Sequence, residues 1–158
     1  VDLPLDAYLP DEYMGSYGAK VREYQRLASL KTISSVEEAI ADIRDRFGEL
    51  PEAVANMATI LRVKARASEL GIPSITTYNH ELIIKLPSGR RVNSALIAKA
   101  IGRQMRQGHH GLVWRGFQDA PEWPEQLLAL LDSILRWNSL ETSEEEPVTT
   151  GSGDISPQ

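Results

Sequence analysis

Cysteine is absent from the 158 residues, which excludes disulfides and thiolate chemistry and suits a cytoplasmic protein. No apolar run approaches the roughly 20 residues that a membrane-spanning helix needs, and no signal peptide opens the sequence. We therefore expect a cytoplasmic chain without membrane contact. The first residue is Val1 rather than methionine, so we also expect this chain to be a piece of a longer protein.

Residues that bind nucleotides or metals, or that catalyse reactions, are scarce as well. The glycines are scattered and lack the Lys-Ser/Thr partner of a phosphate-binding loop. Histidine occurs only at His80, His109 and His110. His109 and His110 are adjacent, so on regular structure they point in different directions and make a poor metal site. A histidine beside a turn, such as His80, is more often a surface residue than a catalytic base. The sequence predicts no catalytic residues, no metal site and no cofactor in this chain.

The composition is that of one soluble globular domain. The hydrophobic fraction is 42% and the charged fraction is 25%, both ordinary values, and the length suffices for one core. The net charge of −5 argues against general nucleic-acid binding. The charges are unevenly distributed, however. The range 82–118 contains no Asp or Glu, whereas the range 119–158 contains Arg136 as its single basic residue.

The acid-free stretch has more than one interpretation. It could be a nucleic-acid patch, in which basic side chains contact phosphates and an aromatic side chain stacks on a base. Its members would be Lys85, Arg90, Arg91, Arg103, Arg106, Trp114 and Arg115. The stretch 85–115 could instead dock another protein. In the simplest interpretation, the basic and acidic segments offset each other across one folded surface.

Apolar residues at helical spacing predict three helices in the first half. The first covers about 17–28 and follows a turn-rich segment over 11–18. The second is predicted to begin after Ser35, because Ser35 and Glu38 have the spacing of a capping box, and to end at Gly48. The third follows Pro51 and ends at Gly71.

β-branched residues and turn signals then predict extended structure. The ranges 72–78 and 81–86 form a hairpin, 90–92 is a short extended segment, and 112–117 is a further strand. One helix is expected after Asn93 or Ser94, with a buried face that reaches Met105, and a last helix over about 123–137 with Leu135 facing inward. The predicted fold class is α+β, with a helical N-terminal half followed by a small, mainly antiparallel sheet packed with helices.

The sequence changes character after residue 137. Beyond this point Ser, Thr, Gly, Glu and Pro dominate, and too little apolar surface remains to offset chain entropy. We therefore expect one domain over 1–137 and a disordered acidic and polar tail over 138–158.

Two stretches resemble the C-terminal domain of bacterial transcription-repair coupling factors (Mfd). Residues 2–14 resemble the extended arm that begins that domain, and the helix after the arm ends in the similar Tyr24-Gln25-Arg26-Leu27-Ala28. The second stretch is Asp45-Arg46-Phe47-Gly48-Glu49-Leu50-Pro51, followed at the expected distance by Leu70-Gly71-Ile72. The resemblance covers 1–72, with both stretches in the family's order. From 73 to 137 only the layout is similar, and the range 15–18 departs from the family's usual Pro-Asp helix start.

The resemblance implies a role inside a larger machine. The longer protein would be an ATP-dependent DNA translocase that uses ATP and Mg in its motor domains. It would bind double-stranded DNA and stalled RNA polymerase, and it would recruit the excision-repair ATPase UvrA through a UvrB-like N-terminal module. In that family the C-terminal domain packs on the UvrB-like module, hides the recruiting surface and restrains the motor. The isolated domain is expected to be a monomer.

Asp42, Asp45 and Arg46 are the expected intramolecular interface. They lie at i, i+3 and i+4 on the second predicted helix, beside or opposite its apolar stripe, and so form one charged patch. We hypothesise that this patch pairs with charged groups on the UvrB-like module. An ordinary solvated helix face is the alternative.

Overall fold

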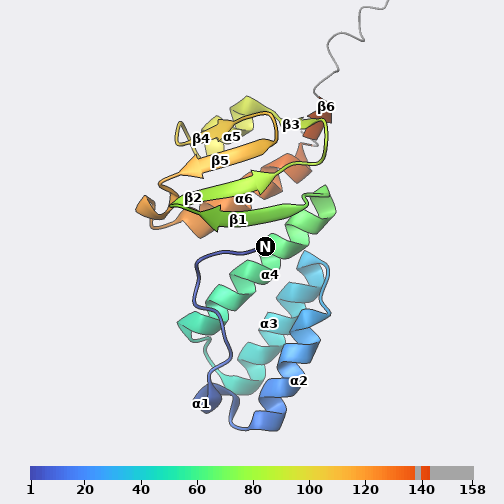
Figure 1. The fold of residues 1–158 in the computed structure, drawn as a ribbon. Helices are drawn as coiled ribbons and strands as arrows, with labels where there is room; N and C mark the ends of the chain where they lie inside the picture. Colours follow the sequence, from blue (N-terminus) through green and yellow to red (C-terminus); the bar gives the residue numbers. More distant parts are fainter. Residues whose placement is uncertain (138–139, 143–158) are drawn as a thin grey trace, which may run out of the picture.

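A helical half and a sheet-containing half share one long helix, α4 (Figure 1). The computed structural model describes residues 1–137 and 140–142. The helical half contains α1 (Asp11–Met14), α2 (Tyr17–Ala28), α3 (Ile33–Phe47) and α4 (Glu52–Leu70). The rest follows as β1 (Ser74–Tyr78), β2 (Glu81–Lys85), β3 (Arg90–Val92), α5 (Ser94–Ala100), β4 (Met105–Gln107), β5 (Gly111–Arg115), the 3-10 helix η1 (Phe117–Asp119), α6 (Trp123–Arg136) and β6 (Leu140–Thr142). The predicted α+β fold class is confirmed.

The predicted helix ends are confirmed at Gly48 and Gly71, which both take positive φ angles. The predicted start of α3 is wrong by about one turn. Thr32 is its N-cap: the Thr32 hydroxyl accepts a hydrogen bond from the Ser35 N–H, and the Ser35 hydroxyl accepts one from the Thr32 N–H. This reciprocal pair satisfies the backbone N–H groups of Thr32 and Ser35, so the helix begins before the predicted cap at Ser35. The predicted turn-rich segment also contains a short helix, α1.

The helix α4 takes part in two hydrophobic cores. Its first half buries Val54 and Ala58 in a core that the arm, α2 and α3 complete. Its second half buries Val63 and Ala67 in a core with the sheet, α5 and α6. Because one continuous helix belongs to both cores, it fixes the orientation of the helical half relative to the sheet.

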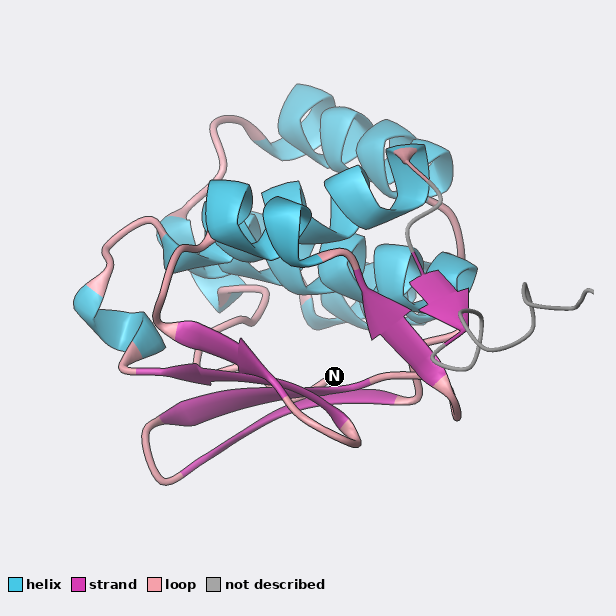
Figure 2. Cartoon of the chain, turned by 90° about the horizontal axis from the view of Figure 1, so that it is seen from above, coloured by secondary structure: helices cyan, strands magenta, loops and turns pink. Residues whose placement is uncertain are grey.

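The four-stranded sheet is antiparallel, with strand order β1-β2-β5-β4. Leu82, Ile84 and Leu112 are fully buried and point toward the helices. Figure 2 shows the helices gathered on one side of this sheet. The strand β4 was not predicted, because its buried Met105 fits the helical stripe of α5. Gly102, with φ 105°, ends that helix first.

The last helix, α6, faces the core slightly differently from the prediction. Leu135 was expected to face inward but is 36% exposed, whereas Leu130 is fully buried. None of the helices among the described residues is long and apolar enough to cross a membrane.

Three residues of the predicted tail belong to a strand. Leu140–Thr142 forms β6, which pairs antiparallel with β3, and Leu140 packs partly against the sheet core. The prediction of disorder is therefore wrong for residues 140–142, because pairing with β3 supplies backbone partners that composition does not reveal. The remainder of the predicted tail lies outside the described residues.

One side chain joins the two sheets. The Gln107 amide nitrogen donates to the Val92 carbonyl at 2.8 Å, and the Val92 N–H donates to the Gln107 amide oxygen at 2.7 Å. The Gln107 side chain of β4 therefore makes the same two hydrogen bonds to Val92 of β3 that the backbone of a neighbouring strand would make. Val92 is 3% exposed, so water does not readily replace either bond.

We expect Gln107→Ala to lower the free energy of unfolding by about 2 kcal/mol, because it leaves the buried Val92 N–H and C=O unpaired. Urea unfolding measures this loss. Gln118→Ala is the matched control, since Gln118 is exposed and should change stability by less than about 0.5 kcal/mol. Equal stability of the two variants would show that the bridge contributes nothing.

Candidate functional site

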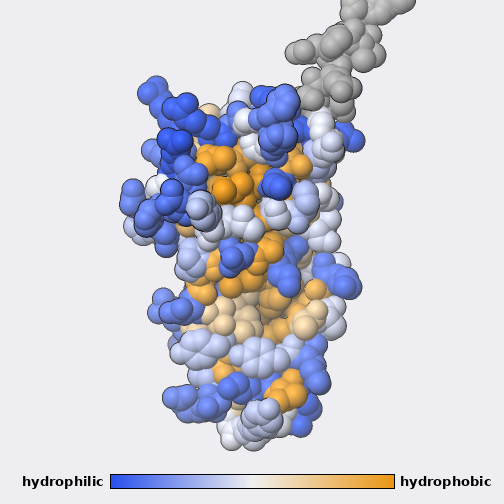
Figure 3. All heavy atoms as spheres, viewed as in Figure 1, coloured by the Kyte–Doolittle hydropathy of each residue, from blue (hydrophilic) through white to orange (hydrophobic). Residues whose placement is uncertain are grey.

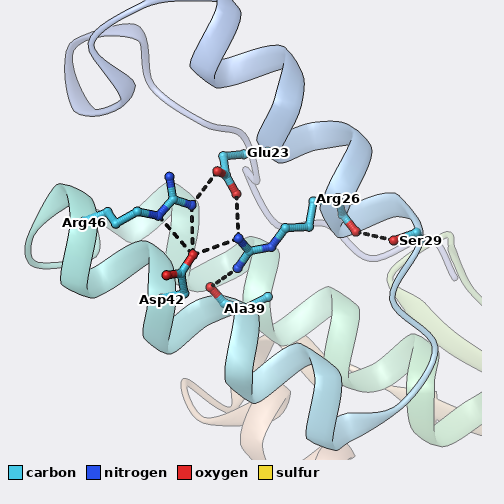
Figure 4. Close-up of polar contacts among 6 residues, drawn as sticks. All are labelled: Glu23, Arg26, Ser29, Ala39, Asp42 and Arg46. Carbon is cyan, nitrogen blue, oxygen red and sulfur yellow. Dashed lines mark hydrogen bonds and ion pairs between the residues drawn. The ribbon is translucent and has the colours of Figure 1, made fainter.

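Four charged side chains form a cluster between α2 and α3 (Figure 4). Arg46 contacts Glu23 at 2.5 Å through one guanidinium nitrogen and donates to Asp42 at 3.0 Å through Nε. Arg26 donates to the same Asp42 oxygen at 2.7 Å and to the Ala39 carbonyl at 3.1 Å. The cluster thus alternates in charge and connects the two helices by direct hydrogen bonds.

Helical spacing places these side chains together. Glu23 and Arg26 are three residues apart on α2, and Asp42 and Arg46 are four residues apart on α3, so each pair lies on one face of its helix. On α2 the described buried residues are Glu23 and Leu27. Because α2 buries little apolar surface, the hydrogen bonds of the charge cluster add to a small apolar contact.

Burial differs sharply across the cluster. The Glu23 side chain is 7% exposed, whereas the side chains of Arg26, Asp42 and Arg46 are between 37% and 43% exposed. One Glu23 oxygen, Oε1, has no hydrogen-bond partner among the described residues and lies 3.7 Å from Arg26. The cluster therefore has a buried carboxylate at its base and three side chains that reach solvent.

Hydrogen bonds from Arg26 and then Arg46 lower the pKa of Asp42 below its ordinary value. The hydrogen bonds that Arg46 donates to Glu23 and then to Asp42 raise the pKa of Arg46. A carboxylate whose pKa is lowered by folding stabilises the fold above its unfolded-state pKa of about 3.9. This contribution of Asp42 is lost as the pH falls through the folded-state pKa.

The structure separates the three residues of the predicted interface. Asp42 and Arg46 belong to the charge cluster, whereas Asp45 is exposed and forms no ion pair within 1–137 and 140–142. Sequence reasoning missed Glu23 and Arg26. Their spacing on α2 was visible, but no local signal shows that this face of α2 meets Asp42 on α3.

The residues of the predicted basic patch do not share one surface. Trp114 is 2% exposed and packs against Phe117 in the core, so its predicted stacking on a base is wrong. Trp114 faces the helices because it lies opposite Leu82 in the sheet register. Lys85, Arg106 and Arg115 occupy the opposite face, Arg90 and Arg91 lie on β3, and Arg103 lies in the turn after α5.

The histidines do not gather with carboxylates. No group of three His, Cys, Asp or Glu residues that could hold a metal ion occurs in the described part of the chain. His109 and His110 contact each other edge to face, with ring centroids 5.4 Å apart. His80 has φ 65° in the β1–β2 turn.

The model of the TRCF domain family matches residues 3–97, which is more than half of the chain. The chain belongs to the TRCF domain family. The match includes all of the arm except its first residue, together with the charge cluster and the first three strands. It also includes Asp42, Asp45 and Arg46, which were singled out from the sequence.

Relatives of the TRCF domain are much longer than this chain. The transcription-repair-coupling factor of Escherichia coli (strain K12) is 30% identical over 110 residues, which are 70% of this chain and 9% of the relative. The transcription-repair-coupling factor of Staphylococcus aureus (strain USA300) is 30% identical over 113 residues, 68% of this chain and 10% of the relative. The chain thus spans about a tenth of the length of these curated relatives.

A solved structure has the same fold. The crystal structure of the C-terminal domain of transcription-repair coupling factor superposes with a TM-score of 0.70 at 23% identity. The match covers 85% of this chain and 90% of the solved chain. Because this coverage is larger than that of the family model, the likeness of fold includes some of the chain outside residues 3–97.

Proposed function

We propose that this TRCF domain is a non-catalytic, autoinhibitory part of a transcription-repair coupling factor. In this proposal it packs on a UvrB-like N-terminal module, masks the surface that recruits UvrA and restrains an ATP-dependent DNA translocase. ATP and Mg act in the motor domains of the full-length protein, and this domain holds no cofactor. The charged surface of α2 and α3 is the observation that carries the proposal.

The α2–α3 surface is suited to a contact that forms and breaks. Asp42, Arg26 and Arg46 hold one another in fixed positions, so a partner need not order these long side chains on binding. Each of them still has more than a third of its side-chain area in solvent, and Asp45 is exposed beside them. Polar contacts of this kind are typical of reversible interfaces between domains.

The energetic requirement on such a lock is modest. Switching a two-state equilibrium from about 1:99 to 99:1 takes a differential binding energy of about 5.5 kcal/mol. In the proposed cycle, binding of the full-length protein to stalled RNA polymerase on double-stranded DNA supplies this energy. The domain then leaves the UvrB-like module, UvrA binds, and the motor is released for transcription-coupled repair.

We expect Asp45→Arg in the full-length protein to raise the ATPase rate several-fold in the absence of polymerase. Asp45 makes no ion pair among the described residues, so the change should weaken the lock without disturbing the α2–α3 cluster. A loss of about 1–2 kcal/mol would shift the closed-to-open ratio roughly 5- to 30-fold. The measurement is steady-state ATP hydrolysis, together with UvrA pull-down.

Glu125→Arg is the matched control, because Glu125 is exposed on α6 in the other half of the domain. It changes the net charge equally and should leave both readouts unchanged. A normal ATPase rate and no UvrA binding in the Asp45→Arg protein would exclude Asp45 from the contact.

A further inference from the structure

The outer face of the four-stranded sheet has an apolar centre. The strand registers place Thr76, Ile83, Val113 and Arg106 opposite one another in a row across β1, β2, β5 and β4. Side chains directly opposite on neighbouring strands point to the same face. Ile83 and Val113 are partly exposed, whereas their neighbours Leu82, Ile84 and Leu112 are fully buried on the inner face.

Two further rows border this centre and contain two basic residues and one acidic residue. Tyr78, Glu81 and Arg115 form one row, and Ser74, Lys85 and Gly111 form the other. Glu81 is the single carboxylate in these three rows, and Arg115 pairs with it at 2.9 Å. Lys85 and Arg106 are exposed and make no ion pair within the described residues. The face therefore presents two free cations beside apolar side chains.

No helix or strand among the described residues covers this face. The helices lie on the opposite side of the sheet, as Figure 2 shows. Figure 3 shows apolar side chains gathered over β2 and β5, with hydrophilic side chains along their border. A shallow hollow on the same face is lined by Glu81, Arg106, Val113 and Arg115.

We propose that this outer sheet face docks an acidic amphipathic segment of another protein, with apolar side chains on Ile83 and Val113. Its carboxylates would pair with Lys85 in one bordering row and with Arg106 at the β4 end of the central row. Burying the apolar centre supplies non-directional binding energy, and the two cations select the charge and fix the orientation of the segment. This surface is separate from the α2–α3 surface, so the inference does not depend on the proposed autoinhibition.

Nucleic acid fits the same face less well. Single-stranded nucleic acid binds to platforms of aromatic side chains, but the centre here is aliphatic, Trp114 is buried and Tyr78 lies at the corner. The phosphate backbone of a duplex would make no favourable contact with the aliphatic side chains of Ile83 and Val113. The net charge of −5 also opposes the approach of a polyanion, whereas a short acidic segment carries far less charge.

The test uses the chain of residues 1–158 and a synthetic helical peptide of about five turns, with leucine along one face and glutamate on both sides. Fluorescence anisotropy measures its binding. We expect Lys85→Glu with Arg106→Glu to weaken binding at least about tenfold. Lys64→Glu, an exposed position on α4, is the control and should bind like the wild-type chain. Circular dichroism confirms that each variant is folded.

A second variant separates apolar docking from simple charge attraction. Val113→Lys adds a cation but removes an apolar side chain from the centre, so we expect weaker binding. Stronger binding by this variant would overturn the proposal, because it would mean that charge alone attracts the peptide.

Two other outcomes would also overturn it. One is tighter binding of a double- or single-stranded oligonucleotide that Arg106→Glu abolishes, which would make the face a nucleic-acid site. The other is a many-fold gain in peptide affinity when residues 143–158 are removed, which would make the chain's own acidic end the occupant.

Discussion

Replacing Gly111 by alanine is expected to lower the free energy of unfolding by about 3 kcal/mol. A Cβ atom at Gly111 would lie 2.0 Å from the Ile84 carbonyl oxygen and 3.1 Å from the Lys85 Cα. Both are backbone atoms of β2, and Gly111 lies opposite Lys85 in the β2–β5 register. The methyl group therefore forces the two central strands apart.

The measurement is a thermal or urea melt, in which about 3 kcal/mol corresponds to a fall of roughly 6–12 °C in Tm for a chain of this size. Gly108→Ala is the matched control. Gly108 lies in the connection just before β5, and a Cβ there would meet no atom within 4 Å. It should change stability by less than about 0.5 kcal/mol. Wild-type stability of Gly111→Ala would show that β2 and β5 do not pair in this register.

The second large effect is expected for Arg46→Met. The change removes the hydrogen-bonded partner of Glu23 and leaves a carboxylate with 7% side-chain exposure beside Arg26 at 3.7 Å. Breaking a fully buried pair typically costs about 3–5 kcal/mol. Because the Arg46 side chain is 43% exposed, water screens the pair and we expect about 2 kcal/mol.

The double variant Glu23→Gln with Arg46→Met tests this cause directly. Removing the carboxylate charge should recover part of the lost stability, so the two changes should not add in a double-mutant cycle. Arg44→Met is the control, since Arg44 is exposed near the same helix end and forms no ion pair among the described residues. If Arg46→Met costs no more than Arg44→Met, the cluster does not hold α2.

Much of the fold could be predicted from local signals. Gly48 and Gly71 mark helix ends because glycine adopts positive φ without a Cβ penalty, and the β1–β2 hairpin follows from its turn residues. The misassigned start of α3 has a local cause too. Thr32-Ser35 and Ser35-Glu38 have the same spacing, and only the structure shows that the earlier pair forms the capping box.

Other features depend on contacts between distant segments. Met105 suits a buried helix face as well as a buried strand position, and pairing with Trp114 places it in β4. The strand β6 exists through β3, and local composition carries no trace of that pairing. Period-two alternation favours the inner face for Trp114, which it shares with Leu112, while Arg115 suits the exposed face. The basic residues around Trp114 in the sequence led to the opposite interpretation.

The candidate site could be predicted only in part from the sequence. Helical spacing brought Asp42, Asp45 and Arg46 together, since that information lies within α3. The structure adds that Asp42 and Arg46 already bind Glu23 and Arg26 across the α2–α3 contact. Which charged groups meet across two helices depends on tertiary packing, so sequence spacing alone did not reveal the cluster.

The most direct test of the account is the ATPase rate of the full-length protein with and without the region of residues 1–158, measured in the absence of polymerase. An autoinhibitory domain predicts that deletion raises the rate and allows UvrA to bind. If the rate and UvrA binding both stay unchanged, the domain does not restrain the motor, and the proposed function is contradicted.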